Sequence, residues 1–280
     1  MRLKTTTFAL LLAALAGPAA AQVAPYDLRV NPYPVPYPFY DSQSSEHSIF
    51  SMSYVRTSIA QNNAPNLALN GGAVGVTYRR AIDDQLAWDA QFSIVPLVGS
   101  VSDPATGHTQ TMSFVGVPLT TDVEYQAWKN QTFNVIVFGG PHFNIVSSNF
   151  EDYGPGNYNT TGFNPTGTGT NTYGTTTLLY GLQFGAQLGV ETGFVKLAPF
   201  VELTPEWGTY TTKAYSPVQN DTVSTSNSLP TSFMTSVGVQ AFFGPGFGVS
   251  AVYQTVPSYS ANNTTYESFR NLLVNVNIAF

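Results

Sequence analysis

The chain has 280 residues, with 10 basic and 16 acidic side chains, a formal net charge of −6, no cysteine, 9% charged residues and 14% aromatic residues. The acidic balance argues against a nucleic-acid partner, and the lack of cysteine excludes disulfides, thiolate metal sites and a cysteine nucleophile. Soluble domains carry about 25% charged residues, so this composition favours a surface that faces lipid.

A basic start precedes the apolar run 8–15 and a stretch of small residues that ends at Ala21. This order predicts a secretory signal peptide over residues 1–21, cut after Ala21. A transmembrane helix needs about 20 apolar residues, and no stretch after the signal peptide approaches that length. If the chain crosses a bilayer, it must do so as a closed β-barrel, because strands then satisfy every backbone hydrogen bond.

Residues 22–45 contain five prolines among four tyrosines and a phenylalanine. Proline at this density prevents strand pairing and favours an extended polyproline conformation. We interpret the segment as a periplasmic arm that precedes a barrel domain over residues 46–280. Two roles stay open for it, a tether and a docking segment for the cell wall or a periplasmic partner.

From His47 onward, ten runs of residues place an apolar side chain at every second position. Alternation at period two is the signature of a β-strand. The predicted apolar faces begin at Phe50, Val74, Leu86, Val115, Phe133, Leu178, Val195, Phe233, Phe247 and Leu272. We predict an all-β fold, a transmembrane antiparallel up-and-down β-barrel of about ten strands.

The connections between these runs alternate between short and long. Short turns are expected at 82–85, 128–131, 192–193 and 244–246. Long polar links are expected at 60–71, 99–110, 147–176, 208–231 and 256–268. Short periplasmic turns opposite long extracellular loops are typical of outer-membrane barrels.

Aromatic spacing points the same way. Phe133 and Phe143 share one face, and ten residues of tilted strand project to roughly 25 Å, the height of a lipid-facing band between aromatic girdles. The predicted periplasmic girdle contains Trp88, Tyr125, Phe243, Phe247 and Phe280. The predicted opposite girdle contains Phe143, Tyr180, Trp207, Phe233 and Tyr253.

The last nine residues alternate apolar with mostly polar side chains and end on an aromatic residue. Val274, Val276, Ile278 and Phe280 form the apolar series. This segment resembles the C-terminal β-signal of bacterial outer-membrane proteins, and with the strand pattern the resemblance covers about residues 46–280. It implies insertion by the outer-membrane assembly machinery and residence in the outer membrane of a Gram-negative-type envelope.

The inward face is expected to be polar and to hold paired charges. Arg79 and Asp89 lie at nearly equal distances from their turn and are candidates for a luminal salt bridge. Glu191, Lys196 and Glu202 form a second charged group.

Glycines on the inner wall, such as Gly185, leave space that inward phenyl rings can fill. The candidate rings are Phe114, Phe138, Phe200 and Phe242. A barrel of ten strands lies near the limit at which side chains close the lumen.

Arg56 and Arg270 interrupt the outward apolar pattern near the predicted extracellular end, on strands that become neighbours when the barrel closes. Both guanidinium groups could bind the phosphate of an anionic outer-membrane lipid. Simple snorkelling of each side chain to the interface is the alternative interpretation.

The residues give little support to catalysis, and we expect no catalytic residue, metal site or cofactor. The predicted function is therefore non-enzymatic: envelope structure, surface interaction, or a narrow pore for small solutes. The alternative is a hydrolase centred on His142, which lies inward with Glu206 placed to orient it. Such a hydrolase would be a lipid-modifying enzyme or a protease resembling the ten-stranded omptins. The chain lacks the omptins' adjacent His-Asp pair, and its pair Asp83-Asp84 lies in a predicted periplasmic turn.

Overall fold

The computed structural model describes residues 46–60, 66–103, 108–154, 169–216, 221–244, 246–261, 264–266 and 268–280. The predicted signal peptide (1–21) and arm (22–45) lie outside these residues. The long strands are β1 (Glu46–Ile59), β2 (Leu67–Ala81), β3 (Leu86–Asp103), β4 (His108–Lys129), β5 (Phe133–Gly154), β6 (Gly169–Glu191), β7 (Val195–Ser216), β8 (Asp221–Phe243), β9 (Phe247–Val256) and β12 (Phe269–Ala279). In the described part of the chain, no helix is long and apolar enough to cross a membrane.

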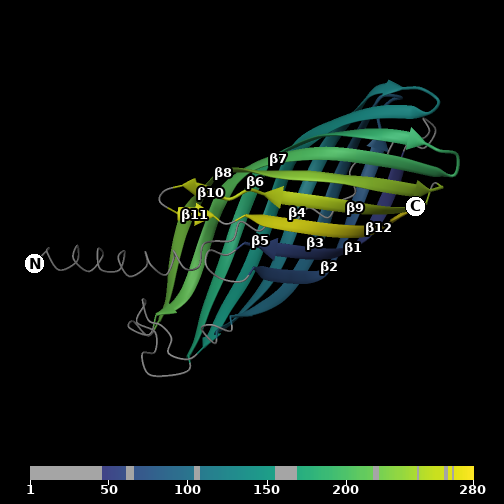
Figure 1. Ribbon diagram of the computed structural model, residues 1–280. Helices are drawn as coiled ribbons and strands as arrows, with labels where there is room; N and C mark the ends of the chain where they lie inside the picture. Colours follow the sequence, from purple (N-terminus) through teal and green to yellow (C-terminus); the bar gives the residue numbers. More distant parts are fainter. Residues whose placement is uncertain are drawn as a thin grey trace, which may run out of the picture.

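These ten strands close into one antiparallel barrel in the order β1-β12-β9-β8-β7-β6-β5-β4-β3-β2 (Figure 1). The predicted all-β barrel of ten strands is confirmed. The link between β9 and β12 also contains β10 (Tyr259–Ala261) and β11 (Thr264–Tyr266), which form a separate two-stranded sheet that the sequence pattern did not predict.

The barrel closes between the first and last strands. β1 pairs with β12 from Ile49 opposite Ala279 to Ile59 opposite Phe269. Ser48 and Phe280 continue this ladder by exchanging two backbone hydrogen bonds, of 3.0 and 2.9 Å. The prediction that the strands of Arg56 and Arg270 become neighbours when the barrel closes is confirmed.

Side chains alternate across the wall as predicted. On β12 the outward side chains Leu272 and Val274 are 48% and 49% exposed, whereas the inward Leu273 and Asn275 are fully buried. The predicted girdle residues also point outward: Phe143, Tyr180 and Trp207 lie side by side on β5, β6 and β7. An apolar outer face on every strand is unfavourable in water and favourable in lipid.

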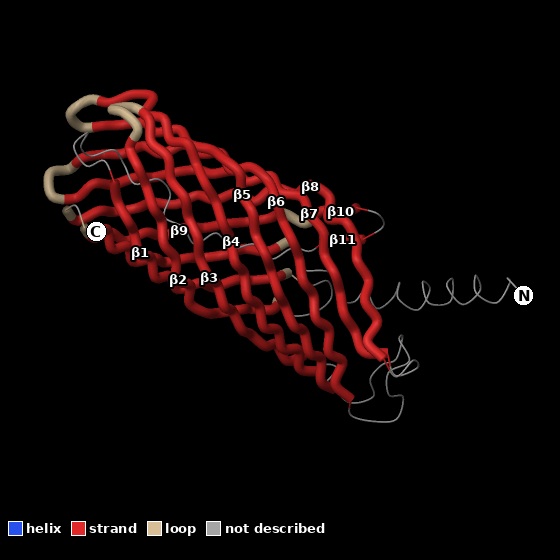
Figure 2. Tube along the Cα trace, turned by 180° about the vertical axis from the view of Figure 1, so that it is seen from behind, coloured by secondary structure: helices blue, strands red, loops and turns tan. Residues whose placement is uncertain are grey.

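The short turns gather at the end of the barrel that carries the C-terminus (Figure 2). Asp83 shapes the first turn, because its carboxylate accepts hydrogen bonds from the backbone N–H groups of Gln85 and Leu86, both at 2.7 Å. Gly193 and Gly244 have positive φ angles of 91° and 74°, a backbone conformation that other residues adopt only with strain.

Two predicted short turns were misplaced. The turn predicted at 128–131 lies at 130–132, because a β-bulge between Gln126 and Trp128 adds a residue to β4. A bulge breaks strict alternation, so the pattern could not locate the end of this strand. The turn predicted at 192–193 includes Phe194 as well.

The predicted long links were too long, because the strands continue far into them. β4 to β8 contain 22 or 23 residues each, while β9 has 10 and β12 has 11. One side of the barrel is therefore much taller than the other, and β6, β7 and β8 extend well past the ends of β9 and β12 (Figure 1). The parts of β4 to β8 that lie farther from the short turns than a given residue of each strand are called the extension. These residues are Val115, Ile145, Leu178, Trp207 and Phe233.

Polarity inverts at the base of the extension. On β5 the outward series changes from Ile145 to Ser147 and Asn149, while the inward positions hold the buried Val146 and Phe150. On β7 the outward Thr209 is followed by the buried Tyr210. The extension thus has the polar outside and apolar inside of a sheet in water. This inversion is why outward apolar alternation ended too early in the predicted strands.

The barrel interior is correspondingly divided, which corrects the prediction of a polar inward face throughout. Polar and charged side chains fill the half next to the short turns, and a buried apolar cluster fills most of the other half. This cluster includes Val55, Ile59, Leu67, Leu69, Val95, Leu97, Met112, Phe114, Val146, Phe150, Leu179, Tyr210, Leu229, Val256 and Phe269.

The inward phenyl rings do occupy the space above glycines. A Cβ atom on Gly185 would collide with the ring of Phe138, and one on Gly238 would lie 2.8 Å from the ring of Phe200. Phe242 covers Gly248 in the same way, also at 2.8 Å. Each of these rings belongs to the strand paired with its glycine.

Candidate functional site

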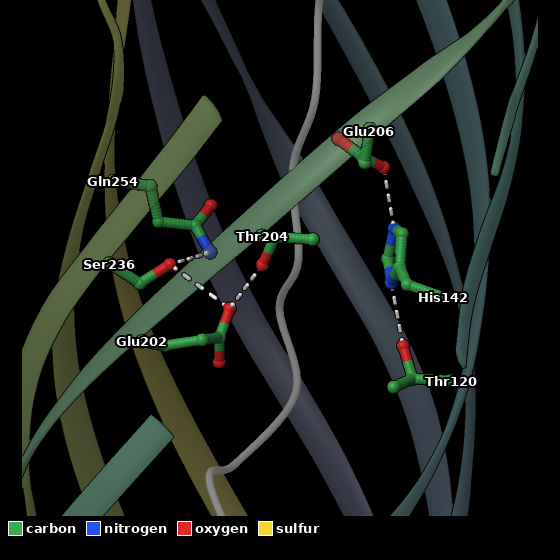
Figure 3. A network of polar contacts seen from close by, with 7 residues as sticks. All are labelled: Thr120, His142, Glu202, Thr204, Glu206, Ser236 and Gln254. Atoms are coloured by element: carbon green, nitrogen blue, oxygen red, sulfur yellow. Dashed lines mark hydrogen bonds and ion pairs between the residues drawn. The ribbon is translucent and has the colours of Figure 1, made fainter. Parts of the chain in front are cut away.

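His142 lies at the centre of a buried polar cluster on the inner wall. Its Nε2 atom lies 2.9 Å from Oε1 of Glu206, and its Nδ1 atom lies 2.8 Å from Oγ1 of Thr120 (Figure 3). Relative exposure is 3% for His142, 0% for Glu206 and 1% for Thr120. With its proton on Nε2, the ring turns its N–H side toward the carboxylate and accepts a hydrogen bond at Nδ1 from the hydroxyl group.

The cluster depends on a glycine between its members. Thr120, His142 and Glu206 lie on β4, β5 and β7, and the position on β6 that pairs with both His142 and Glu206 is Gly181. A Cβ atom at Gly181 would collide with the backbone oxygen of Pro205 and would lie 2.9 Å from Cα of Glu206. The bare backbone of β6 therefore lets two side chains meet across it.

The same construction recurs nearer the short turns. Gln183 on β6 donates a hydrogen bond of 3.0 Å to Asp122 on β4, and between them on β5 lies Gly140. A Cβ atom at Gly140 would collide with the backbone of Thr121. Glycines at inward positions thus allow polar side chains to connect strands that are not neighbours.

Arg79 makes a third connection of this kind. Its Nε atom lies 2.9 Å from Oε2 of Glu124 on β4, although β3 separates the two strands. The predicted partner Asp89 lies directly opposite Arg79 in the β2–β3 register, and its carboxylate accepts a 2.8 Å hydrogen bond from Gln91. Asp122 lies opposite Asp89 on β4, so one cation is placed among three buried carboxyl groups.

The second predicted charged group is divided in the structure. Lys196 and Glu191 lie 3.4 Å apart as a partly exposed pair next to a short turn. Glu202 is buried higher on β7, where Thr204 and Ser236 donate hydrogen bonds of 3.2 and 3.3 Å to its carboxylate (Figure 3).

From Glu202 a chain of hydrogen bonds runs across the closing strands. Its links join Ser236 on β8, Gln254 on β9, Asn271 on β12 and Thr57 on β1, with distances between 2.8 and 3.3 Å. This chain connects the last strands to the first and so supports closure of the barrel.

The predicted site residues on the outer face of the barrel fall into two separate groups. Arg56 and Arg270 lie on neighbouring strands at the closing seam, both exposed. Val274, Val276, Ile278 and Phe280, the predicted assembly signal, all point outward and are between 39% and 78% exposed.

The His142 cluster has the chemical groups of a hydrolytic site, a hydroxyl, an imidazole and a carboxylate in sequence. Its burial opposes that use, because a nucleophile must contact its substrate. Among the described residues, no group of three or more His, Asp and Glu side chains is arranged to hold a metal ion.

Sequence reasoning placed His142 and Glu206 on the inner wall but did not include Thr120 in the cluster. The available signal was the inward parity of Thr120 on the strand before His142. The pairing that brings Gly181 between His142 and Glu206 could not be read from parity, because register depends on the bulges and turns of four strands.

No model of a protein family matches the chain, and no curated protein matches it in sequence. Among solved structures, the outer membrane protease OmpT from Escherichia coli aligns with 84% of this chain and 96% of its own, at a TM-score of 0.58 and 9% identity. The translocator domain of the autotransporter NalP from Neisseria meningitidis covers 98% of both chains, at a TM-score of 0.44 and 10% identity.

The attachment invasion locus protein Ail of Yersinia pestis aligns with 84% of this chain and 99% of its own, at a TM-score of 0.35 and 11% identity. At such low identities a likeness concerns the fold alone, and of these three structures OmpT supports it by its TM-score. The chain has the closed antiparallel β-barrel fold of bacterial outer-membrane proteins.

Proposed function

We propose that this chain is a non-enzymatic outer-membrane barrel that acts in surface interaction, with the extension as its contact surface. The observation that carries this proposal is the length and polarity of β4 to β8. A membrane-spanning strand needs about 9–11 residues, whereas these strands have 22 or 23. The remaining residues stand beyond the apolar belt.

The exposed side chains of the extension suit an uncharged polar partner. Its outer face presents mostly hydroxyl and amide groups, which both donate and accept hydrogen bonds. They include Ser147, Asn149, Thr176, Thr209, Ser226 and Ser228. Neighbouring strands align them in rows: Ser147 pairs with Thr176, Thr176 with Thr211, and Thr211 with Ser226. We propose neutral glycans as the class of partner.

The register also shows how to test this proposal. Because Ile145 and Leu178 are direct partners, as are Gly208 and Leu229, residues 146–177 and residues 209–228 can each be replaced by an Asn-Gly turn, which removes the whole polar row. The trimmed barrel keeps the apolar belt and the His142 cluster. We expect the full barrel to bind members of an array of uncharged oligosaccharides and the trimmed barrel to lose that binding. The proposal would be contradicted if the full barrel bound no oligosaccharide of the array, or if the trimmed barrel bound the same oligosaccharides equally well.

The pore interpretation receives less support. Inward side chains as small as Ser93, Ala198 and Ser236 are 0% or 1% exposed, which is unlike the lining of a water-filled channel. Conductance in a planar bilayer tests it directly, and we expect none above the background of the lipid.

A hydrolase centred on His142 is the second candidate, favoured by the contacts of His142 with Glu206 and Thr120. Its test is turnover of peptide and lipid ester substrates by the folded barrel and by His142→Ala. Activity in the first that is lost in the second, with the variant still folded, would replace the surface-interaction proposal.

We further propose that the route to the membrane follows the sequence predictions. Export would use the signal peptide over residues 1–21, and insertion would use the assembly machinery acting on residues 272–280. The outward series on β12 supports the second step, because an edge strand must be recognised before β1 and β12 pair.

A further inference from the structure

We propose that Arg56 and Arg270 form a binding site for the phosphate group of an anionic lipid in the outer leaflet. The two residues lie on β1 and β12, which pair at the closing seam. In this register Arg56 lies opposite Leu272, and Arg270 lies opposite Ser58. The arginines are thus diagonal neighbours on the outward face, about 7–8 Å apart at the backbone, a separation that long side chains bridge.

Their height on the wall matches that of a lipid headgroup. Ten positions separate Arg270 from Phe280, the same spacing as between Phe133 and Phe143. Since Phe280 belongs to the girdle beside the short turns, Arg270 lies at the level of the opposite girdle. Arg56 lies two residues nearer the short turns than Arg270, beside the apolar side chain of Leu272.

Within the described ranges, the charges of these two side chains are not balanced by a carboxylate. No described residue forms an ion pair or a hydrogen bond with the guanidinium group of Arg56 or Arg270. By contrast, Arg79 pairs with Glu124 and Lys196 with Glu191. Two exposed cations on adjacent strands repel each other unless an anion lies between them, and phosphate accepts the forked donors of two guanidinium groups.

A polar neighbour adds a donor at the same point. Asn70 lies opposite Arg56 on β2, and its Oδ1 atom accepts a 3.1 Å hydrogen bond from the hydroxyl group of Tyr54. This contact leaves the NH₂ end of the amide as a donor beside Arg56. Thr255 on β9 lies opposite Arg270 from the other side, but its hydroxyl group donates to the backbone oxygen of Phe269 at 3.3 Å. Snorkelling of a lone arginine would require neither the pairing of the two arginines nor the donor of Asn70.

The test uses the folded barrel in neutral detergent, with lipid binding measured by native mass spectrometry. The probes are lipid A with both phosphates and lipid A from which both phosphates have been removed. We expect wild type to prefer the phosphorylated lipid by about tenfold or more, as charge-assisted hydrogen bonds predict. Equal binding of the two lipids by the wild type would overturn the proposal.

Variants locate the site. Arg56→Gln with Arg270→Gln should abolish the preference, and Arg56→Lys with Arg270→Lys should retain part of it, because lysine keeps the charge but loses the forked geometry. The control Lys129→Gln with Lys213→Gln removes the same two charges elsewhere on the barrel and should leave the preference intact. A preference that survives in the double Gln variant, or that the control loses equally, would overturn the assignment.

Inorganic phosphate distinguishes the lipid from a free anion. We expect millimolar phosphate to compete weakly with phosphorylated lipid A, because the adjoining apolar wall contributes to binding of the acyl chains. Equal affinity for inorganic phosphate and for the lipid would overturn the lipid as the ligand. The whole test is independent of the glycan array, since these arginines lie outside the extension.

Discussion

His142 and Glu206 meet at 2.9 Å across a strand to which neither belongs. Their contact is possible because β6 contributes only the backbone of Gly181 at that point. Similar connections join Gln183 with Asp122 and Arg79 with Glu124. The inner wall is therefore held together by neighbouring strands and also by side chains that reach the next strand but one.

A methyl group at Gly181 should break the first of these connections. We expect Gly181→Ala to lower the free energy of unfolding by about 1–3 kcal/mol, the usual cost of overpacking, because the added Cβ collides with the backbone of β7. Urea unfolding of the barrel in lipid vesicles measures the loss. Gly72→Ala is the matched control, since the nearest atom to its Cβ lies at an ordinary 3.5 Å. Equal effects of the two substitutions would contradict the account.

Removal of the imidazole should cost more than neutralisation of its partner. His142→Ala leaves the fully buried carboxyl group of Glu206 without the ring, which we expect to destabilise the barrel by about 3–5 kcal/mol. Glu206→Gln keeps the size and shape of the side chain beside the ring and removes the buried charge, so the loss of stability should be clearly smaller. The same unfolding assay compares the two variants, and the reverse order would show that the contact is not the source of stability.

The ring of Phe138 and the bare backbone of Gly185 should be energetically coupled. Phe138→Ala is expected to cost about 3–5 kcal/mol as a large-to-small change. Gly185→Ala is expected to cost about 1–3 kcal/mol, because its Cβ collides with the ring. In the double variant the collision is absent, so its loss of stability should be smaller than the sum of the losses of the two single variants. Strict additivity would mean that the ring does not cover the glycine.

The proposed role of Phe280 in assembly can be separated by mutation from its place in the backbone ladder. Deletion of Phe280 removes both its ring and the backbone hydrogen bonds with Ser48, while Phe280→Ala keeps the backbone. If the aromatic group is the assembly signal, both variants should reduce the fraction of folded barrel in the outer membrane severalfold. Gel mobility with and without boiling measures that fraction. Normal assembly of Phe280→Ala would contradict the signal role and leave the barrel fold intact.

Sequence reasoning succeeded where one physical contrast dominated. On β12, the apolar outward Val274 and Val276 alternate with the polar inward Asn275 and Asn277. A similar contrast between outward and inward side chains in the other strands was enough to predict the number of strands, the closure of the barrel and the aromatic girdles. Sequence reasoning failed in the extension, where Ser147 and Thr176 pair in a regular ladder but their outward side chains are polar. A hydrogen-bonded backbone continues whether or not its side chains alternate in hydrophobicity.

The candidate site shows a similar limit. The alternation of inward and outward positions along each strand placed His142 and Glu206 on the inner wall. Together with the distance from the turn, it predicted that Arg79 and Asp89 lie opposite each other. It could not show that Arg79 extends to Glu124, because reach across a strand depends on which small residues lie between. The bulge near Gln126 shifts the register of β4 against β5. The residue types in that segment do not predict a bulge.

The boundary between lipid and water on the tall side of the barrel tests the central claim most directly. The chain has no cysteine, so a single introduced thiol reports its own position without background. On intact cells that carry the protein, a membrane-impermeant maleimide should label Ser147→Cys and Ser228→Cys in the extension and should not label Val137→Cys or Val201→Cys in the belt. Labelling of the belt positions, or protection of the extension positions in the folded protein, would contradict a membrane-spanning barrel with an extracellular polar wall.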